Sequence, residues 1–249
     1  SSPVCPGDAT FSVAASANAG ATKLVKGDAD ATFMPGVGQS LSGGSSQWQI
    51  NIGNYGNVTP LTNVIAYDIF PYVGDTGVSE GQVTVPRLTE FVPTLDGPVT
   101  APAGVTISYS QSSNPCRPEL IPTGPLGCDD DWSTSFPGPG MAKAIRIDGG
   151  SLVLDPGEFL TLTYTMGLPA TAEGGQIAWN SVAFRATRTD DGRDLMPTEP
   201  PKVGIKIIET SVGDFVWYDT NRDGLQTAGE PPYGGMTVEL YAANAVVDV

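Results

Sequence analysis

The segment Phe159-Leu-Thr-Leu-Thr-Tyr-Thr-Met166 alternates apolar side chains with threonine at a period of two residues. Successive side chains of a β-strand point to opposite faces, so Leu160, Leu162, Tyr164 and Met166 share one face and the three threonines share the other. This pattern is typical of a strand that covers a core with one face and meets solvent with the other. It favours an all-β fold class.

Two other segments show the same period. Gln47–Ile52 places Trp48, Ile50 and Ile52 on one face. Ile177–Thr187 also alternates, and the face that carries Asn180 also carries Val182, Phe184 and Ala186. Further strands are predicted at residues 22–25, 61–70, 82–85, 87–91, 105–109, 144–147, 151–154 and 203–208. The acidic and then Gly/Ser-rich stretch 28–44 is predicted to be a loop.

The composition fits many strands joined by turns. The chain has 249 residues, 40% of them hydrophobic, with 31 glycines and 22 prolines, and no long stretch has apolar residues at helical spacing. That length suits one or two domains. The strand number and turn spacing of residues 21–209 predict an immunoglobulin-like, two-sheet β-sandwich.

The chain changes character near its two ends. Residues 1–20 are small and polar, which indicates a leader or an edge strand; they lack the basic and hydrophobic regions of a signal peptide, so we expect a mature or excised chain. Residues 210–249 contain two predicted strands, 212–218 and 236–241, around an acidic loop. About 40 residues are too few for an independent core, so this second domain is expected to be truncated or completed from elsewhere.

The charge balance excludes several classes of function. Lys and Arg number 12 against 27 Asp and Glu, which gives a net charge of −15, and histidine is absent. Such a negative field repels phosphate backbones and suits carboxylate binding of divalent cations. The lack of histidine excludes His-based triads and His-ligated zinc. No run approaches the roughly 20 apolar residues of a membrane span, so we expect no membrane insertion within this segment.

Two of the three cysteines, Cys116 and Cys128, close a short proline-rich stretch. We predict a disulfide between them, contributing about 2–3 kcal/mol for a loop of this length, and hence an oxidising compartment. Two free thiols are the alternative. Cys5 has no predicted partner within the sequence.

The loop from Asp219 to Glu230 carries the most specific motif. Its twelve residues match an EF-hand-type calcium loop, with Gly224 at loop position 6. The predicted Ca²⁺ ligands are Asp219, Asn221, Asp223, the backbone carbonyl of Leu225, and Glu230. Because the flanking segments are predicted strands, the ion is expected to staple a β-domain and not to act as a switch. An acidic turn without an ion is the alternative.

The segment 212–241 resembles the opening of the calcium-binding B domains of serine-aspartate-repeat adhesins. The resemblance covers about 38 residues from Val212 onward, and the rest of such a domain is missing. It implies a partial prealbumin-like β-sandwich for residues 210–249.

Five quoted stretches of the larger unit, 23–27, 48–57, 61–71, 156–164 and 179–184, together resemble the immunoglobulin-like repeats of Gram-positive surface proteins. They also resemble the A-type domains of collagen adhesin and pilins. Many domains of these families carry an internal Lys–Asn isopeptide bond whose formation an Asp on a third strand promotes. The resemblance implies Asn180, Asp68, and either Lys23 or Lys26 as the participants here. A surface lysine, a capping Asp and a hydrogen-bonded core Asn are the alternative.

The chemistry of such a bond suits these residue types. Burial removes the charge of a lysine and makes its amine a nucleophile, while a protonated Asp polarises the Asn carboxamide and ammonia leaves. The lysine is ambiguous, because Lys23 shares a face with Val25 and Lys26 shares the other with Leu24. We favour Lys23.

These features predict a structural or adhesive module of a secreted, cell-wall-associated bacterial surface protein. The alternative is a module that binds a glycan or a host protein through the acidic loop Asp129, Asp130, Asp131 and Trp132. The third hypothesis is a secreted hydrolase, but no pair of carboxylates forms a recognisable catalytic motif. We therefore expect no enzyme activity beyond autocatalytic bond formation. Expected partners are a surface protein or glycan of a host or another cell, or another copy of this chain, and not nucleic acid.

Overall fold

The computed structural model describes residues 18–209 and 216–237. The chain divides into two compact units, one ending at Glu209 and the other beginning at Thr210, and each is considered by itself. The predicted leader 1–20 lies almost wholly outside the described residues. Cys5 and most of the predicted strands 212–218 and 236–241 lie outside them as well.

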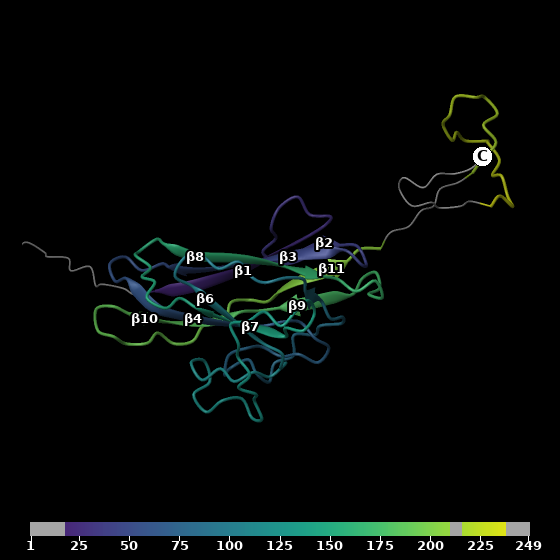
Figure 1. Cartoon of the computed structure of the whole chain (residues 1–249). Helices are drawn as coiled ribbons and strands as arrows, with labels where there is room; N and C mark the ends of the chain where they lie inside the picture. The colour runs from purple at the N-terminus through teal and green to yellow at the C-terminus, as the bar shows by residue number, and fades with distance from the viewer. Residues whose placement is uncertain (1–17, 210–215, 238–249) are drawn as a thin grey trace, which may run out of the picture. The chain divides into compact units, whose positions relative to one another are not determined.

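Strands are the regular elements of the described first unit (Figure 1). They are β1 (Ala19–Gly27), β2 (Val37–Ser40), β3 (Ser45–Asn54), β4 (Leu61–Ile69), β5 (Thr94–Leu95), β6 (Thr106–Ser110), β7 (Ala144–Asp148), β8 (Phe159–Gly167), β9 (Ile177–Asn180), β10 (Ala183–Arg188) and β11 (Val203–Ile207). They form sheets in the orders β1-β3-β8-β5, β10-β4-β7-β6 and β2-β11-β9. The described residues contain no helix, and so none that could cross a membrane.

The first sheet confirms the period-two prediction. In β3 and β8 the apolar residues Trp48, Ile50, Leu162 and Met166 are buried, and Trp48 lies opposite Tyr164 in the antiparallel ladder. The threonines of β8 are exposed. On the other side of β3, Lys23 of β1 lies opposite Ile50. This register gives β1 one buried and one partly exposed face.

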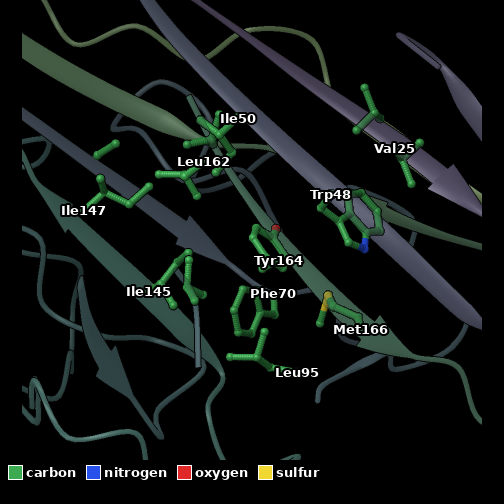
Figure 2. Packing of buried hydrophobic residues seen from close by; sticks show 14 of the residues in the cluster. Val25, Trp48, Ile50, Phe70, Leu95, Ile145, Ile147, Leu162, Tyr164 and Met166 are labelled. Carbon is green, nitrogen blue, oxygen red and sulfur yellow. The ribbon is translucent and has the colours of Figure 1, made fainter. Parts of the chain in front are cut away.

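The core lies between the first sheet and the second. Figure 2 shows Ile50, Leu162 and Tyr164 facing Ile145 and Ile147 of β7, and all five belong to one buried cluster. The third sheet contributes to the same cluster through β9 and β11. The arrangement is an all-β sandwich, as the sequence predicts.

The second sheet is covered on both faces. Tyr67 and Ile69 of β4 point away from the main core and pack with Val78, Leu120 and Ile121 from the long loops that follow β4 and β6. These loops lie beside β4 and β7 in Figure 1. As a result β4 is buried along most of its length, and its intervening residues face the main core.

Several predicted strands differ from the observed ones. Residues 82–85 form turns, in which the N–H groups of Gln82 and Val83 both donate to the carbonyl of Ser79, and 87–91 is irregular. Of 151–154 only Leu154 makes a bridge, to Leu61. Local β-propensity fails here because turn bonds and side-chain contacts take the backbone groups that a ladder would use.

Two further differences come from long-range pairing. The predicted loop 28–44 contains β2, whose small residues form a strand because they pair in parallel with β11. The predicted continuous strand 177–187 is interrupted at residues 181–182. Its halves β9 and β10 belong to different sheets, so the chain crosses from one sheet to another at this point.

Candidate functional site

Lys23 lies in the interior of the first unit. Its side chain is fully buried, and its Nζ is 2.5 Å from Oδ2 of Asp68, which is also fully buried. The Nζ lies 5.5 Å from the ring centre of Trp48 and 5.7 Å from that of Tyr164. A buried ion pair is costly to desolvate and is weak evidence for stability alone, so a role in chemistry is the more informative interpretation.

Strand alternation explains how both charges reach the interior. In β1 the buried positions are Lys23, Val25 and Gly27, whereas Lys26 is partly exposed. In β4, Asp68 follows Ala66 on the face that meets the main core. The structure therefore brings Lys23, and not Lys26, to Asp68.

The environment of Lys23 favours its neutral form. Burial lowers the pKa of Lys23 to about 8, although the Asp68 carboxylate acts in the opposite direction. The ordinary pKa of a lysine is about 10.4, so the neutral amine is far more accessible here near pH 7–8 than on a solvent-exposed lysine. Burial, and then the Asp68 charge, raise the pKa of Tyr164 well above its usual value, which keeps this hydroxyl protonated.

Tyr164 connects this pair to Asn180. The Tyr164 hydroxyl donates to Oδ2 of Asp68 at 2.5 Å and accepts a hydrogen bond from Nδ2 of Asn180 at 3.2 Å. Asn180 is the last residue of β9 and is completely buried. One buried hydrogen-bonded chain therefore runs from Lys23 through Asp68 and Tyr164 to Asn180.

Arg87 contacts the other side of the Asn180 carboxamide. Its Nη1 donates to Oδ1 of Asn180 at 3.0 Å, and its Nη2 lies 2.8 Å from Oδ2 of Asp75. Thr89 donates its hydroxyl to the same Asp75 oxygen at 2.9 Å. Burial raises the pKa of Asp75, and the Arg87 charge opposes this shift.

Sequence reasoning missed Arg87 and Asp75 as members of this cluster and treated Tyr164 only as a core residue. Arg87 falls in a predicted strand, and neither its neighbours nor any spacing marks it as buried. Its position depends on the irregular path of residues 82–91, which only tertiary contacts define.

The predicted disulfide is confirmed. Cys116 and Cys128 are bonded, with their Cα atoms 4.9 Å apart. The same loop is closed by a backbone hydrogen bond from the N–H of Cys116 to the carbonyl of Asp129 at 2.9 Å. The bond therefore fixes one of the long loops that cover the second sheet.

The acidic loop beside this disulfide uses most of its polar groups within the fold. Asp129 accepts from the Ser112 hydroxyl at 2.7 Å, and Asp131 accepts from the N–H of Gln111 at 2.9 Å. The indole of Trp132 donates to the carbonyl of Cys116 at 2.7 Å and packs edge-on against Tyr67. Asp130 is exposed. These contacts give the loop an anchoring role in the fold, although all three of its aspartates are exposed.

The acidic loop of the second unit is a compact turn. Asp219 accepts from the N–H of Gly224 at 2.9 Å, and Glu230 accepts from those of Thr220 at 3.0 Å and Thr227 at 2.9 Å. These backbone hydrogen bonds lower the pKa of Glu230. Gly224 has φ of +74°, a conformation that the sharp turn requires and that glycine adopts without strain.

Three of the predicted ligands of this loop lie close together, because the N–H of Asp223 donates to Oδ1 of Asp219 at 3.2 Å and to Oδ1 of Asn221 at 3.0 Å. Asn221 donates to Asp223, and the side chains of Asp219, Asp223 and Leu225 are all exposed or nearly so. The described residues contain no group of three or more acidic, Cys or His side chains placed to hold a metal. The oxygen-rich donor set still fits a hard cation such as Ca²⁺. The calcium site therefore remains a prediction.

Comparison with protein families gives one match. Residues 210–248 match the SdrD B-like domain, in agreement with the resemblance of this segment to the B domains of serine-aspartate-repeat adhesins. No curated protein matches the chain.

Comparison with solved structures gives only distant likenesses. The major pilin SpaD from Corynebacterium diphtheriae has 11% identity over 75% of this chain and 34% of its own length, with a TM-score of 0.37. A type I cohesin of ScaB from Pseudobacteroides cellulosolvens has 10% identity over 72% of this chain and 92% of its own, also with a TM-score of 0.37. Spo0M, a sporulation control protein from Bacillus subtilis, has 12% identity over 80% of this chain and 51% of its own length, with a TM-score of 0.27.

This chain spans about a third of the length of SpaD. TM-scores this low carry no argument about function, and the sandwich assignment rests on the sheets described above. What the comparisons establish is a similarity of residues 210–248 to the SdrD B-like domain.

Proposed function

We propose that this chain is a structural module of a bacterial cell-surface protein. Its larger unit is cross-linked internally by an amide bond between Lys23 and Asn180, and its second unit is stapled by Ca²⁺. The observation that carries the proposal is the buried hydrogen-bonded chain Lys23–Asp68–Tyr164–Asn180. The similarity of residues 210–248 to the SdrD B-like domain supports the surface location.

The buried cluster supplies the elements that amide formation needs. Lys23 can transfer a proton to Asp68 across 2.5 Å and so become a neutral amine. The Asn180 carboxamide lies in the same water-excluded cluster, where positioning replaces a bimolecular encounter. Formation of the bond releases one molecule of ammonia and needs no cofactor.

A covalent cross-link of this kind suits a load-bearing protein. Folding free energies of about 5–15 kcal/mol allow repeated unfolding, so exposure to tension and proteases is better resisted by covalent bonds. The Cys116–Cys128 disulfide acts in the same sense for the loop that it closes. A secreted location also fits this disulfide.

In the second unit, the side chains of Asp219, Asn221, Asp223 and Glu230 and the carbonyl of Leu225 would hold the ion. Calcium would neutralise their mutual repulsion. It would also cross-link a segment whose described side chains are nearly all exposed.

Single-molecule stretching tests the load-bearing role. Pulling the chain from its ends should extend only the residues outside the 23–180 loop, because the cross-link bypasses the chain between them. At about 3.5 Å per residue, the Asn180→Ala variant should gain roughly 500 Å of additional contour length on unfolding, because the Cys116–Cys128 disulfide keeps its own loop closed. Equal contour lengths for the native chain and the variant would contradict the proposed function.

A further inference from the structure

We propose that Arg87 and Tyr164 are catalytic residues of the amide-forming site: Arg87 stabilises the oxyanion on Asn180, and Tyr164 delivers a proton to the departing nitrogen. This inference rests on the proposed cross-link and adds two groups to the Lys, Asp and Asn that the resemblance implies. Both touch atoms of Asn180 that change bonding in the reaction.

The position of Arg87 is the first argument. Its Nη1 donates to Oδ1 of Asn180 at 3.0 Å, the oxygen on which negative charge develops when an amine attacks the carboxamide carbon. A guanidinium that is only 2% exposed acts there with little screening. A preorganised donor aimed at a developing oxyanion is among the strongest devices for lowering the barrier of acyl transfer.

Neighbouring groups hold the Arg87 guanidinium in one orientation. The ion pair with Asp75 and the carbonyl of Phe70, 3.4 Å from Nη2, fix the guanidinium plane, so that Nη1 is aimed at Asn180. The next residue, Leu88, has φ of +66° and is 70% exposed. A left-handed Leu is unfavourable by about 1–3 kcal/mol and persists only where surrounding contacts require it. Here the residues on either side, Arg87 and Thr89, are both buried in the cluster.

The position of Tyr164 is the second argument. Its hydroxyl lies between Oδ2 of Asp68 and Nδ2 of Asn180, at 2.5 and 3.2 Å. An amide nitrogen is a poor proton acceptor, but it becomes a basic amine once the carbonyl carbon is tetrahedral. At that stage the hydroxyl can pass its own proton to Nδ2 and take one from Asp68 in the same movement.

The complete reaction balances. Lys23 gives one proton to Asp68, and its Nζ lone pair forms a bond to Cγ of Asn180 while the carbonyl electron pair moves to Oδ1 beside Arg87. Asp68 passes its proton through Tyr164 to Nδ2 and accepts the second proton from Nζ. The Cγ–Nδ2 bond breaks, the carbonyl forms again, ammonia leaves, and the last proton on Asp68 converts it to ammonium.

The test measures bond formation during refolding. Unfolded chain from inclusion bodies is diluted into native buffer and quenched at intervals, and the loss of about 17 Da on amide formation is followed by intact mass. Tryptophan fluorescence records folding in parallel. Arg87→Gln should form the bond about 100-fold more slowly than the native chain once folded, and Tyr164→Phe at least tenfold more slowly.

A matched control separates catalysis from packing. Arg117 is a second buried arginine, whose guanidinium donates to the carbonyls of Val78 and Pro115 and not to Asn180. Arg117→Gln should change folding but not the rate of bond formation in folded chain. Arg87→Gln leaves the buried Asp75 carboxylate without its ion-pair partner. If this variant fails to fold, the double variant Arg87→Gln, Asp75→Asn removes that charge and is tested in its place.

The outcomes distinguish the two proposals. If the native chain never loses 17 Da, the cross-link itself is wrong. If the native chain bonds and folded Arg87 and Tyr164 variants bond at the same rate, the cross-link stands and this inference is overturned. A slow rate in these variants with normal folding supports it.

Discussion

The two units of this chain contrast in how their charged residues are placed. In the first, Lys23 and Arg87 are buried in the sandwich and form ion pairs with Asp68 and Asp75, which are also buried. In the second, the acidic loop 219–230 is exposed and its carboxylates bond mainly to their own backbone. Buried charges next to an amide group fit the proposed formation of a covalent bond in the first unit. Exposed carboxylates on a tight turn fit the proposed binding of Ca²⁺ from solvent in the second unit. The first unit should therefore be stable by itself, and the second should depend on an ion.

The largest expected effect comes from breaking the buried pair. Lys23→Ala removes both the proposed cross-link and the Lys23 partner of Asp68, and loss of one member of a buried charge pair alone typically costs about 3–5 kcal/mol. Lys26→Ala, three residues along the same strand and partly exposed, should cost less than about 0.5 kcal/mol. Urea unfolding of both variants measures the difference. Equal stabilities would show that Lys23 is not held as the contacts indicate.

A smaller effect is expected from the disulfide. Replacing Cys116 and Cys128 together by serine should lower the free energy of unfolding of the first unit by about 2–3 kcal/mol, because the closed loop limits the unfolded chain. Urea unfolding of this double variant and the native chain is the measurement. An unchanged midpoint would mean that the loop contributes no stability to the second sheet.

Calcium should act on the second unit alone. At a free concentration ten times its Kd, an ion that binds only the folded form stabilises that form by about 1.4 kcal/mol. Adding a chelator should therefore accelerate protease cleavage after residue 209 and leave the melting of the first unit unchanged. Glu230→Gln should mimic the chelator, and Glu173→Gln, an exposed acid of the first unit, should not. Equal cleavage rates with and without calcium would contradict the proposed stabilisation of the second unit by Ca²⁺.

The smallest effect is a dependence of the rate of bond formation on pH. Burial lowers the pKa of Lys23 to about 8, and the charges of Asp68, Arg87 and Glu199 act on it as well. The Tyr164 ring, 5.7 Å from Nζ, faces the same amine. In the proposed reaction, the proton that Lys23 gives to Asp68 is passed through Tyr164 to Asn180. Below pH 8 Lys23 carries this proton, and above pH 8 Lys23 loses it to solvent. The refolding assay should thus show a flat rate from pH 6 to 8 and a fall of about tenfold per unit above. A rate that instead rises to a plateau above pH 8 would indicate attack by the free amine without the relay.

Much of the fold follows from local pattern, and the rest depends on distant pairing. The alternation of β3 and β8 predicts both their bounds to within one or two residues and their buried faces. The strand β2 could not be predicted, because its four residues, Val-Gly-Gln-Ser, are too few to show an alternating apolar pattern and it forms by pairing with β11. The break between β9 and β10 is equally invisible, since both halves continue one alternating pattern.

The candidate site shows the same division. Lys23, Asp68 and Asn180 could be proposed from the sequence because each lies on a regular strand with a resemblance to guide it. Arg87 could not, because it lies in an irregular segment whose course is determined by contacts with Asp75 and Asn180. The motif of loop 219–230 is also local, because its residue types and spacing can be recognised without any tertiary contact.

The central claim is that the first unit closes a covalent bond between Lys23 and Asn180. Intact mass of the native, disulfide-bonded chain tests it most directly, with fragmentation of the digest to locate the linked peptides. We predict a mass about 17 Da below that of the sequence with its disulfide, and a branched peptide joining residues 23 and 180. A mass equal to that of the disulfide-bonded sequence, with both residues recovered in linear peptides, would contradict it.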